Sequence, residues 1–258
     1  MQEILNQFDP ITLDEMSGIR LMNRTDTKFV TTRPMLERLL AMARHDYFAQ
    51  AIGGQRIAAY FTVYFDTTDC NMYTVHETGH TNRQKLRVRS YVDSQLNFLE
   101  VKTKNNRGRT KKKRVALDDF NPDDSARFDL QADCYGEFLH QYLRYDPQTL
   151  CRQLENRFDR ITLVNKAKTE RLTIDTNLRF CNVATGRRRA MDDIVIIELK
   201  RDGLQPSPIL HMLRDLRIKP HGFSKYVIGS ALTNPNLHCN RMKPKVNDIE
   251  RLLNHQTL

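Results

Sequence analysis

The sequence predicts an α+β protein whose eight antiparallel strands close into a β-barrel, or tunnel, with helices packed outside it. The first observation is that segments 85–91, 100–104 and 196–200 alternate charged residues with apolar ones. Because side chains on a strand point to opposite faces in turn, each segment has one charged face and one apolar face. The second observation is that helical segments separate the groups of strands, which suits an antiparallel barrel with helices outside.

The first half of the chain contains most of the strand signals. A strand is predicted at 24–30, and Pro34 then opens a helix at a position that favours proline. Gly53-Gly54 breaks the chain before a series of β-branched and aromatic segments. The strands predicted from these segments are 56–66, 85–92 and 96–104, and the end of the basic stretch that follows, 111–114, is a candidate for another strand.

The second half opens with a region of helical periodicity at 122–157, interrupted at Asp146-Pro147. Segment 223–232 is either a strand or the start of a helix. The remaining strands are predicted at 161–166, 171–175 and 194–200, and the remaining helices at 206–216 and 246–254. No repeat or low-complexity linker divides the chain, so we expect a single domain over 1–258 with its core at about 20–232.

The charge of the chain points to an anionic ligand. The 258 residues include 41 Lys and Arg against 31 Asp and Glu, which gives a formal net charge of +10. No apolar run approaches the roughly 20 residues of a membrane span, and the N-terminus does not resemble a signal peptide. Five widely spaced cysteines without a Cys-x-x-Cys pair indicate a reduced, cytoplasmic protein.

A set of cations is expected to share one face of the sheet. For a single strand, the solvated side of a half-buried sheet explains such a pattern, but here it recurs on five strands. Cations packed inside a barrel repel one another and need counter-anions, which a triphosphate or polyphosphate supplies at close spacing. The set is Arg24, Lys28, Lys85, Arg87, Arg89, Lys102, Lys104, Lys111, Lys113, Arg171 and Lys200.

Two carboxylates interrupt this cationic set. Glu100 and Glu198 each precede a lysine, Lys102 or Lys200, by two residues and so share its face. One interpretation is charge balancing within the sheet. The other is that one or both bind Mg²⁺ or Mn²⁺, because a hard divalent ion bridges carboxylate and phosphate oxygens.

Three other motifs have weaker interpretations. His76-Glu-Thr-Gly-His80 matches a zinc-protease pattern, but Gly79 and the nearby β-type residues disfavour the stable helix that the pattern needs. The basic run 105–114 lacks the interleaved aromatic residues of a single-strand binding platform, so no nucleic acid is expected. Ser224-Lys225 is more consistent with a phosphate contact than with a nucleophile pair.

Seven segments in order resemble a known family over about 20–232. The segments are Arg24-Thr-Asp-Thr-Lys28-Phe, Tyr64-Phe-Asp66-Thr, Lys85-Leu-Arg-Val-Arg89, Phe98-Leu-Glu-Val-Lys102, Gly108 followed by Lys111-Lys-Lys-Arg114, Ile197-Glu-Leu-Lys200 and Phe223-Ser-Lys-Tyr226. Together they resemble the polyphosphate polymerase domain of the vacuolar transporter chaperone (VTC) family, a branch of the triphosphate tunnel metalloenzymes.

The resemblance implies a basic eight-stranded tunnel and a metal-dependent phosphotransferase. Its substrates would be ATP and inorganic polyphosphate or pyrophosphate, with the γ-phosphate of ATP moved onto a growing chain and Mn²⁺ or Mg²⁺ held by Glu198 and, less directly, Glu100. The catalytic set expected is Lys28, Arg87, Arg89 and Lys200. The phosphate-binding set expected is Arg24, Lys85, Lys102, Lys104, Lys111, Lys113, Lys166, Arg171, Ser224 and Lys225.

The chain departs from the pattern of the hydrolytic tunnel enzymes at its first strand. Where those enzymes carry Glu-x-Glu-x-Lys, this chain has Arg24-x-Asp26-x-Lys28, which suits an anionic acceptor better than water attack. Asn165-Lys166 stands where the family tends to have a Tyr or Arg pair. A tunnel triphosphatase and a non-catalytic module that binds polyphosphate or nucleic acid are the alternatives, and peripheral association with a membrane partner stays open.

Overall fold

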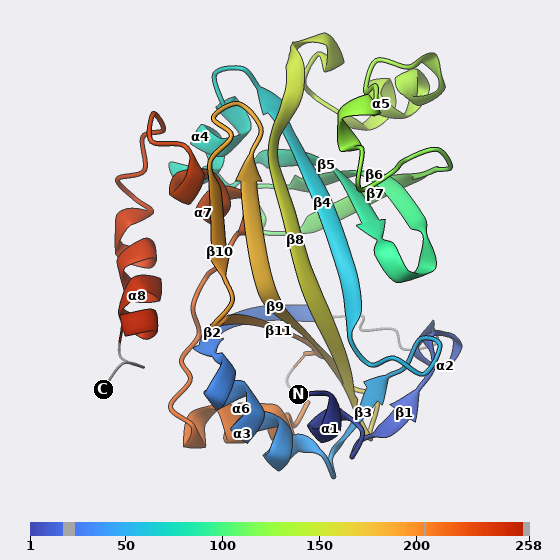
Figure 1. Cartoon of the computed structure of the whole chain (residues 1–258), viewed down its shortest axis with the longest axis vertical. Helices are drawn as coiled ribbons and strands as arrows, with labels where there is room; N and C mark the ends of the chain where they lie inside the picture. Colours follow the sequence, from blue (N-terminus) through green and yellow to red (C-terminus); the bar gives the residue numbers. More distant parts are fainter. Residues whose placement is uncertain (18–23, 204, 255–258) are drawn as a thin grey trace.

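The computed structural model describes residues 1–17, 24–203 and 205–254 (Figure 1). The helices are α1 (Gln2–Leu5), α2 (Leu13–Ser17), α3 (Arg33–Ala43), α4 (Asn71–Glu77), α5 (Gly136–Tyr142), α6 (Pro208–Asp215), α7 (Lys225–Thr233) and α8 (Lys243–Asn254). The strands are β1 (Asp9–Ile11), β2 (Arg24–Thr32), β3 (Tyr47–Gln50), β4 (Ala58–Thr67), β5 (Arg83–Tyr91), β6 (Leu96–Lys104), β7 (Thr110–Leu117), β8 (Leu150–Asn165), β9 (Glu170–Asn182), β10 (Arg188–Met191) and β11 (Ile194–Asp202).

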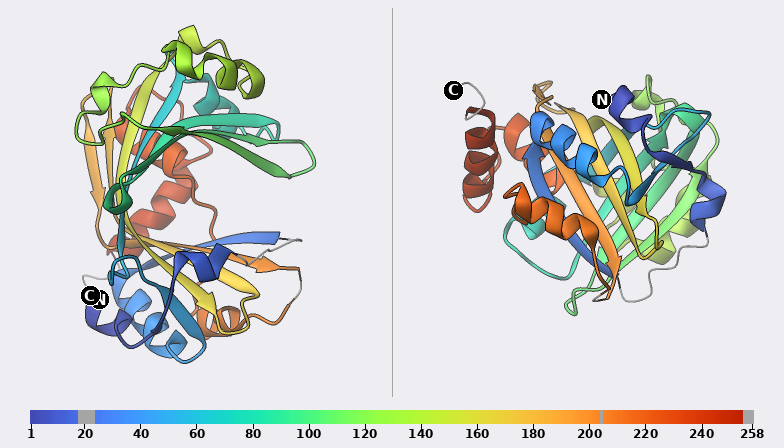
Figure 2. Two further views of the ribbon diagram at one scale, coloured as in Figure 1. Left: turned by 90° about the vertical axis from the view of Figure 1, so that its right-hand side faces the viewer. Right: turned by 90° about the horizontal axis from the view of Figure 1, so that it is seen from below.

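Eight of these strands form one antiparallel sheet in the order β2-β11-β9-β8-β4-β5-β6-β7. β10 pairs with β9, while β3 pairs with β8 and, in parallel, with β1. The sheet bends until its two halves face each other (Figure 2, left). No strand pairing joins β7 to β2 in the described ranges, so hydrogen bonds do not close the barrel. The predicted α+β fold with a tunnel-like antiparallel sheet is confirmed, with the two edges of the sheet not joined by hydrogen bonds.

Helices cover the outer face of the sheet in two places. α1, α3 and α6 pack on β8, β9 and β11, in a core that includes Leu40 and Val195. α5 and its neighbouring turns pack on β4, β5 and β6, in a core that includes Val88 and Leu139. Both cores receive the apolar side chains that alternate with the charged ones along each strand, as the sequence predicted.

α7 differs because it packs on the inner side of the bent sheet (Figure 2). Its sequence is apolar around most of its circumference, which is typical of a buried helix. Tyr226 and Val227 pack with Tyr64, Phe180 and Ile196 from three different strands. The segment 223–232, which the sequence left open between strand and helix, is therefore a helix after Ser224.

Gly229 permits this close approach of α7 to the sheet. A Cβ atom at this position would lie 2.8 Å from Leu154 and still closer to the ring of Phe180. Because carbon atoms in contact are about 3.5–4.0 Å apart, only glycine allows this packing. The helix is thus fixed against β8 and β9.

The helical prediction for 122–157 is correct only for α5. Residues from Leu150 onward instead begin β8, a 16-residue strand that pairs with β4 on one side and β9 on the other. Local spacing of apolar residues could not reveal this, because backbone pairing with β4, which lies far away in the chain, and with the following strand β9 overrides the local preference. β8 also changes register twice along its length, which obscures simple alternation.

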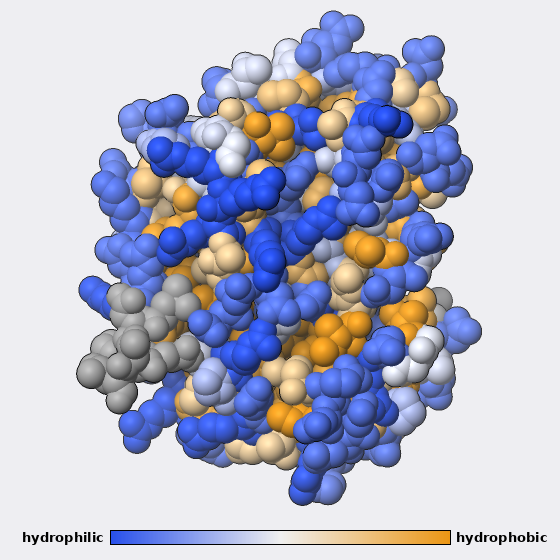
Figure 3. Space-filling model, in the orientation of Figure 1, coloured by the Kyte–Doolittle hydropathy of each residue, from blue (hydrophilic) through white to orange (hydrophobic). Residues whose placement is uncertain are grey.

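The surface is largely hydrophilic in the view of Figure 3, with scattered apolar residues. Exposed side chains of the outer face include Arg157 on β8 and Arg179 on β9. None of the helices in the described part of the chain is long and apolar enough to cross a membrane. All five cysteines are free thiols.

Asp66 joins two helices at the end of β4. Its buried carboxylate accepts hydrogen bonds from the backbone N–H groups of Met72 and Tyr73, both at 2.8 Å, and from the hydroxyl of Tyr226. Burial raises the pKa of Asp66 in spite of these hydrogen bonds. One side chain of a sequence motif thus holds α4 and α7 together.

We expect Asp66→Ala to lower the free energy of unfolding by about 3 kcal/mol, because the backbone N–H and hydroxyl groups that donate to its carboxylate lose their acceptor. Urea unfolding of the purified variant measures the change. Asp69→Ala, at an exposed position of the following turn, is the control and should change stability by less than about 0.5 kcal/mol. Equal stability of the two variants would contradict the role given to Asp66.

Candidate active site on the basic inner face

We call the side of the sheet that carries Lys85, Arg87 and Arg89 the inner face. On the neighbouring strand, Lys102 lies opposite Lys85 and Glu100 lies opposite Arg87. Directly opposed residues of an antiparallel pair share a face. The charged stripe of β5 therefore continues onto β6, as the alternation in the sequence predicted.

The other half of the bent sheet carries a second charged stripe. Glu198 on β11 lies opposite Lys28 on β2, and Lys200 lies between Asp26 on β2 and Arg171 on β9. The two stripes face each other, since the charge of Lys28 lowers the pKa of Lys102 and that of Lys102 lowers the pKa of Glu198. Residues far apart in the sequence thus form one charged site.

Glu100 is the fully buried counter-ion of the first stripe. One of its oxygens accepts a hydrogen bond from Nε of Arg87 at 2.8 Å, and the other accepts one from Nζ of Lys112 at 2.9 Å. Burial alone would raise the pKa of Glu100, but Arg87, Arg89 and Lys112 lower it to about 2. Because both oxygens are engaged by cations, this geometry favours charge balancing over metal binding for Glu100.

The pairing of β7 corrects the expected orientation of its lysines. Lys112 lies opposite Lys102, and Arg114 lies opposite Glu100, so these two side chains share the inner face. Lys111 and Lys113 alternate with them and take the outer face, where Nζ of Lys113 lies 5.1 Å from the ring centroid of Tyr142. The prediction that Lys111 and Lys113 line the inner face is wrong by one residue, which on a strand reverses the face.

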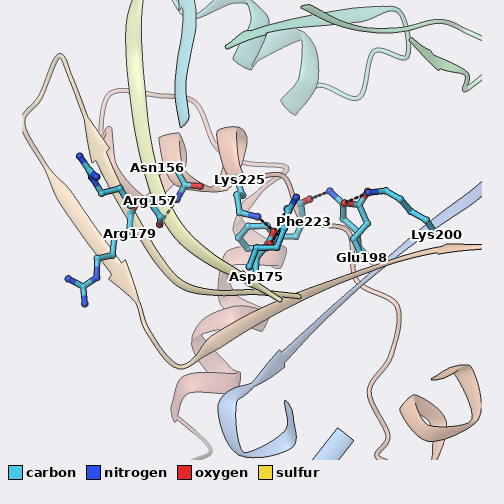
Figure 4. Close-up of polar contacts among 10 residues, drawn as sticks. Asn156, Arg157, Asp175, Arg179, Glu198, Lys200, Phe223 and Lys225 are labelled. Carbon is cyan, nitrogen blue, oxygen red and sulfur yellow. Dashed lines mark hydrogen bonds and ion pairs between the residues drawn. The ribbon is translucent and has the colours of Figure 1, made fainter. Parts of the chain in front are cut away.

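Glu198 is a carboxylate of the second stripe whose side chain is partly exposed (Figure 4). Nζ of Lys200 lies 3.5 Å from its Oε2 atom, and its side chain is 21% exposed. Burial alone would raise the pKa of Glu198, but Lys200, Lys28 and other cations lower it to about 2. The carboxylate is therefore ionised near neutral pH and is accessible to a ligand.

A divalent cation fits this donor set. No group of three or more His, Cys, Asp or Glu side chains that could hold a metal occurs among the described residues. Mg²⁺ is usually bound through one or two carboxylates, with phosphate oxygens and water as the other ligands. Glu198, ionised and surrounded by phosphate-binding cations, is suited to that arrangement, so the fit depends on a phosphorylated ligand being present.

Asp175 connects β8, β9 and α7. It accepts two hydrogen bonds from Arg160, at 2.6 and 2.9 Å, and one from Nζ of Lys225 (Figure 4). Burial alone would raise the pKa of Asp175, but the two cations hold it well below its usual range. Neither Asp175 nor Arg160 was among the expected site residues. Alternation beyond Arg171 would have indicated Asp175, whereas Arg160 lay outside every predicted strand.

The first turn of α7 brings Ser224 into the site. The hydroxyl oxygen of Ser224 accepts a hydrogen bond from the N–H of Val227 at 3.3 Å, which caps the helix, and one from Nζ of Lys85 at 2.9 Å. Nearby, Nζ of Lys28 donates to the backbone oxygen of Phe223 at 2.9 Å. The positive end of a helix dipole therefore adds to the charge of the lysines.

Cations exceed carboxylates on this inner face. Arg89 is 7% exposed, and none of the described carboxylates forms an ion pair with it or with Lys85. Burial and neighbouring cations lower the pKa of both side chains, that of Lys85 strongly. The site thus holds positive charge that an anion would stabilise.

The remaining expected residues lie in several places. Lys104 follows Lys102 on the same face of β6, whereas Lys166 lies beside β1 and β3, where it pairs with Asp9. Arg24 lies opposite Asp202 on β11, but its side chain falls outside the described part of the structure. The His76 and His80 pair does not share a helix face, because α4 ends at Glu77.

The fold and this site define a class of protein in which the two facing halves of a bent β-sheet carry cations suited to binding a polyanion. The chain matches the VTC domain over residues 23–234 and therefore belongs to the VTC domain family. Membership in this family supports a tunnel-type enzyme that acts on triphosphates. A search of curated proteins finds no match.

Two solved structures are similar to this chain at low sequence identity. An adenylate cyclase candidate from Bacillus halodurans is 15% identical, with a TM-score of 0.51 over 79% of this chain and 96% of that chain. An adenylyl cyclase candidate from Hippeastrum, described as having a dominant triphosphatase activity, is 14% identical, with a TM-score of 0.48 over 83% of this chain and 98% of that chain. The similarity to the Bacillus halodurans protein shows a shared fold and does not by itself show a shared function.

We expect binding of inorganic tripolyphosphate to weaken as the pH rises above about 8. Burial and the charges of Lys28 and Arg87 lower the pKa of Lys102 to about 8, although its side chain is exposed and water screens part of this repulsion. Above this pH the lysine loses the charge that attracts the ligand. Isothermal titration calorimetry between pH 7 and 10 measures the change.

The lowered pKa of Lys102 has the opposite effect on the stability of the unliganded protein, which it makes rise with pH. The folded pKa lies below the unfolded value of about 10.4, so between about pH 8 and 10.4 the unfolded chain binds more protons and the contribution of Lys102 to stability rises with pH. Lys102→Met should flatten the pH dependence of binding, whereas Lys113→Met, the same change on the outer face, should not. A Lys113→Met variant that flattens it equally would contradict the assignment.

Proposed function

We propose that this protein is a polyphosphate polymerase that moves the γ-phosphate of ATP onto a growing inorganic polyphosphate chain. The observation that carries the proposal is the excess of cations over carboxylates on the inner face, which includes the buried Arg89, within a VTC domain. A linear polyanion with closely spaced charges is the ligand that matches a charged stripe on each of two facing walls. The free thiols support a reducing compartment, the cytoplasm, as its location.

The triphosphate is held by cations from both walls and from α7. Arg87, Arg89 and Lys102 contribute from one wall, and Lys200 and Arg171 from the other. Glu100 and Asp175 fix the guanidinium groups of Arg87 and Arg160 by hydrogen bonds, so the cations are positioned before the ligand arrives. Ser224 and Lys225 present the start of α7 to the phosphates.

The reaction itself requires positioning and charge neutralisation. An oxygen of the terminal phosphate of the chain attacks the γ-phosphorus, the bond from that phosphorus to the β-bridging oxygen breaks, and ADP leaves. Lys28 orients the attacking phosphate, because its Nζ is held at Phe223 next to the phosphate-binding turn. A Mg²⁺ or Mn²⁺ ion at Glu198 would supply further neutralisation of the charge on the phosphate oxygens when bound.

Incubation of the purified protein with ATP and Mn²⁺, followed by gel electrophoresis, tests the proposal. A long anionic polymer together with ADP is the expected product. Free phosphate with no polymer would replace the polymerase with a triphosphatase, and unchanged ATP would leave a binding module. An Arg89→Ala variant should lose polymer formation, whereas Lys111→Ala, on the outer face, should retain it.

A further inference from the structure

Four aromatic side chains gather at one end of the inner face. Tyr60 stacks on Phe158 with their ring centroids 5.2 Å apart, and Tyr91 lies 5.0 Å from Tyr60. Phe98 meets Tyr91 edge-on at 5.9 Å. They come from β4, β8, β5 and β6, so only the folded sheet brings them together. We call these four residues the aromatic cluster.

Guanidinium groups lie over these rings. The Cζ atom of Arg160 is 4.8 Å from the centroid of Tyr60, and that of Arg89 is 5.6 Å from the same centroid. Arg114 covers Phe98 at 4.2 Å. Guanidinium planes and aromatic rings together are the groups on which proteins stack nucleobases.

The aromatic cluster is continuous with the phosphate site. Arg89 and Arg160 contact the cluster, while Asp175 links Arg160 to Lys225 of α7. Along β5, Arg87, Arg89 and Tyr91 share one face, and each step of two residues covers about 7 Å. A nucleotide whose phosphates lie at Arg87 and Arg89 would therefore bring its base to Tyr91.

The exposure of the cluster distinguishes it from the hydrophobic cores. Tyr60, Tyr91 and Phe98 are only partly buried, and Arg114 is exposed, whereas Phe158 beneath them is buried. Core aromatic residues such as Phe61 and Phe180 are almost fully buried. A partly exposed platform beside a triphosphate site is suited to a planar ligand group.

We infer that the aromatic cluster and Arg114 form the subsite for the base of the nucleoside triphosphate. This inference rests on the proposed function, and it gives the substrate a direction. The base lies at the Tyr91 end of the inner face, and the phosphates extend toward Lys85 and Ser224. Stacking accepts any base, so the subsite distinguishes nucleoside triphosphates from inorganic triphosphate rather than one base from another.

Binding of ATP and of inorganic tripolyphosphate, measured by calorimetry for each variant, tests this inference. Stacking contributes about 1–3 kcal/mol per base, so Tyr91→Ala and Phe98→Ala should weaken ATP binding about 5- to 150-fold. Tripolyphosphate has no base, and its affinity should stay within about twofold. Arg114→Ala, a change at an exposed position that leaves the core intact, should weaken ATP binding selectively as well.

Phe138→Ala is the matched control, because Phe138 is a partly buried aromatic residue of α5 whose ring contacts Tyr142 at a tilt on the outside of the sheet. It should change neither affinity. Equal weakening of both ligands, or of neither, in the Tyr91, Phe98 and Arg114 variants would overturn the inference while leaving the proposed function intact. A wild-type protein that binds neither ligand would overturn both.

Discussion

Glu198→Gln is expected to lower the rate of polymer formation by about 10²–10³-fold, the effect typical of losing one preorganised charge-stabilising group. The substitution keeps the shape of the side chain but removes its charge. Glu198 is an inner-face carboxylate with a partly exposed side chain and Lys200 at 3.5 Å, so it is suited to hold a divalent ion. The rate is measured with saturating ATP and Mn²⁺.

A second measurement separates loss of the metal from loss of the fold. In EDTA, tripolyphosphate binding to Glu198→Gln should equal or exceed that of the wild type, because a negative charge has been removed from an anion site. Glu137→Gln, at an exposed position of α5, is the control and should retain full activity. Full activity of Glu198→Gln would rule out the metal site at this residue.

Asp175→Ala is expected to lower the free energy of unfolding by about 3–5 kcal/mol, because it leaves the largely buried side chains of Arg160 and Lys225 without their counter-ion. Urea unfolding at pH 7 without ligand measures the loss. Tripolyphosphate should restore more stability to the variant than to the wild type, since the anion replaces the missing charge. Asp118→Ala, at an exposed position, is the control.

The effect of Asp175→Ala should depend on pH. The folded pKa of Asp175 lies below its unfolded value of about 3.9, so its contribution is complete above that value and is lost as the pH falls toward the folded pKa. The difference between wild type and variant should therefore shrink below about pH 4. A loss under about 1 kcal/mol at pH 7 would show that Asp175 does not hold the two cations.

The sequence predicted the stripes of β5, β6 and β11 because alternation is a local property of a strand. It could not predict which lysines of β7 face inward, because the register of β7 depends on the turn at 105–109 and on pairing with β6. The first part of β8, residues 150–160, was missed because its partner β4 lies far away in the chain, whereas the end of β8 was predicted as the strand at 161–166. Arg160, one of the site's central cations, was therefore missed with it.

The aromatic cluster shows a second limit of predicting a binding site from the linear sequence. No aromatic residue interrupts the basic run 105–114, which argued against a stacking platform. Tyr60, Tyr91, Phe98 and Phe158 meet only because four strands bring them together on the folded sheet. Composition near a charged run therefore says little about what lies across a sheet from it.

Gly229 has a consequence for how defects in this protein should be interpreted. The helix that begins at Ser224 and Lys225 is fixed, one turn later, against Phe180 and Leu154 with no room for a single added carbon. Any side chain there would push the whole helix, and its first turn would carry the phosphate-binding groups away from Lys85. A mutagenesis screen for inactive protein should thus recover this uncharged core position alongside the charged residues themselves.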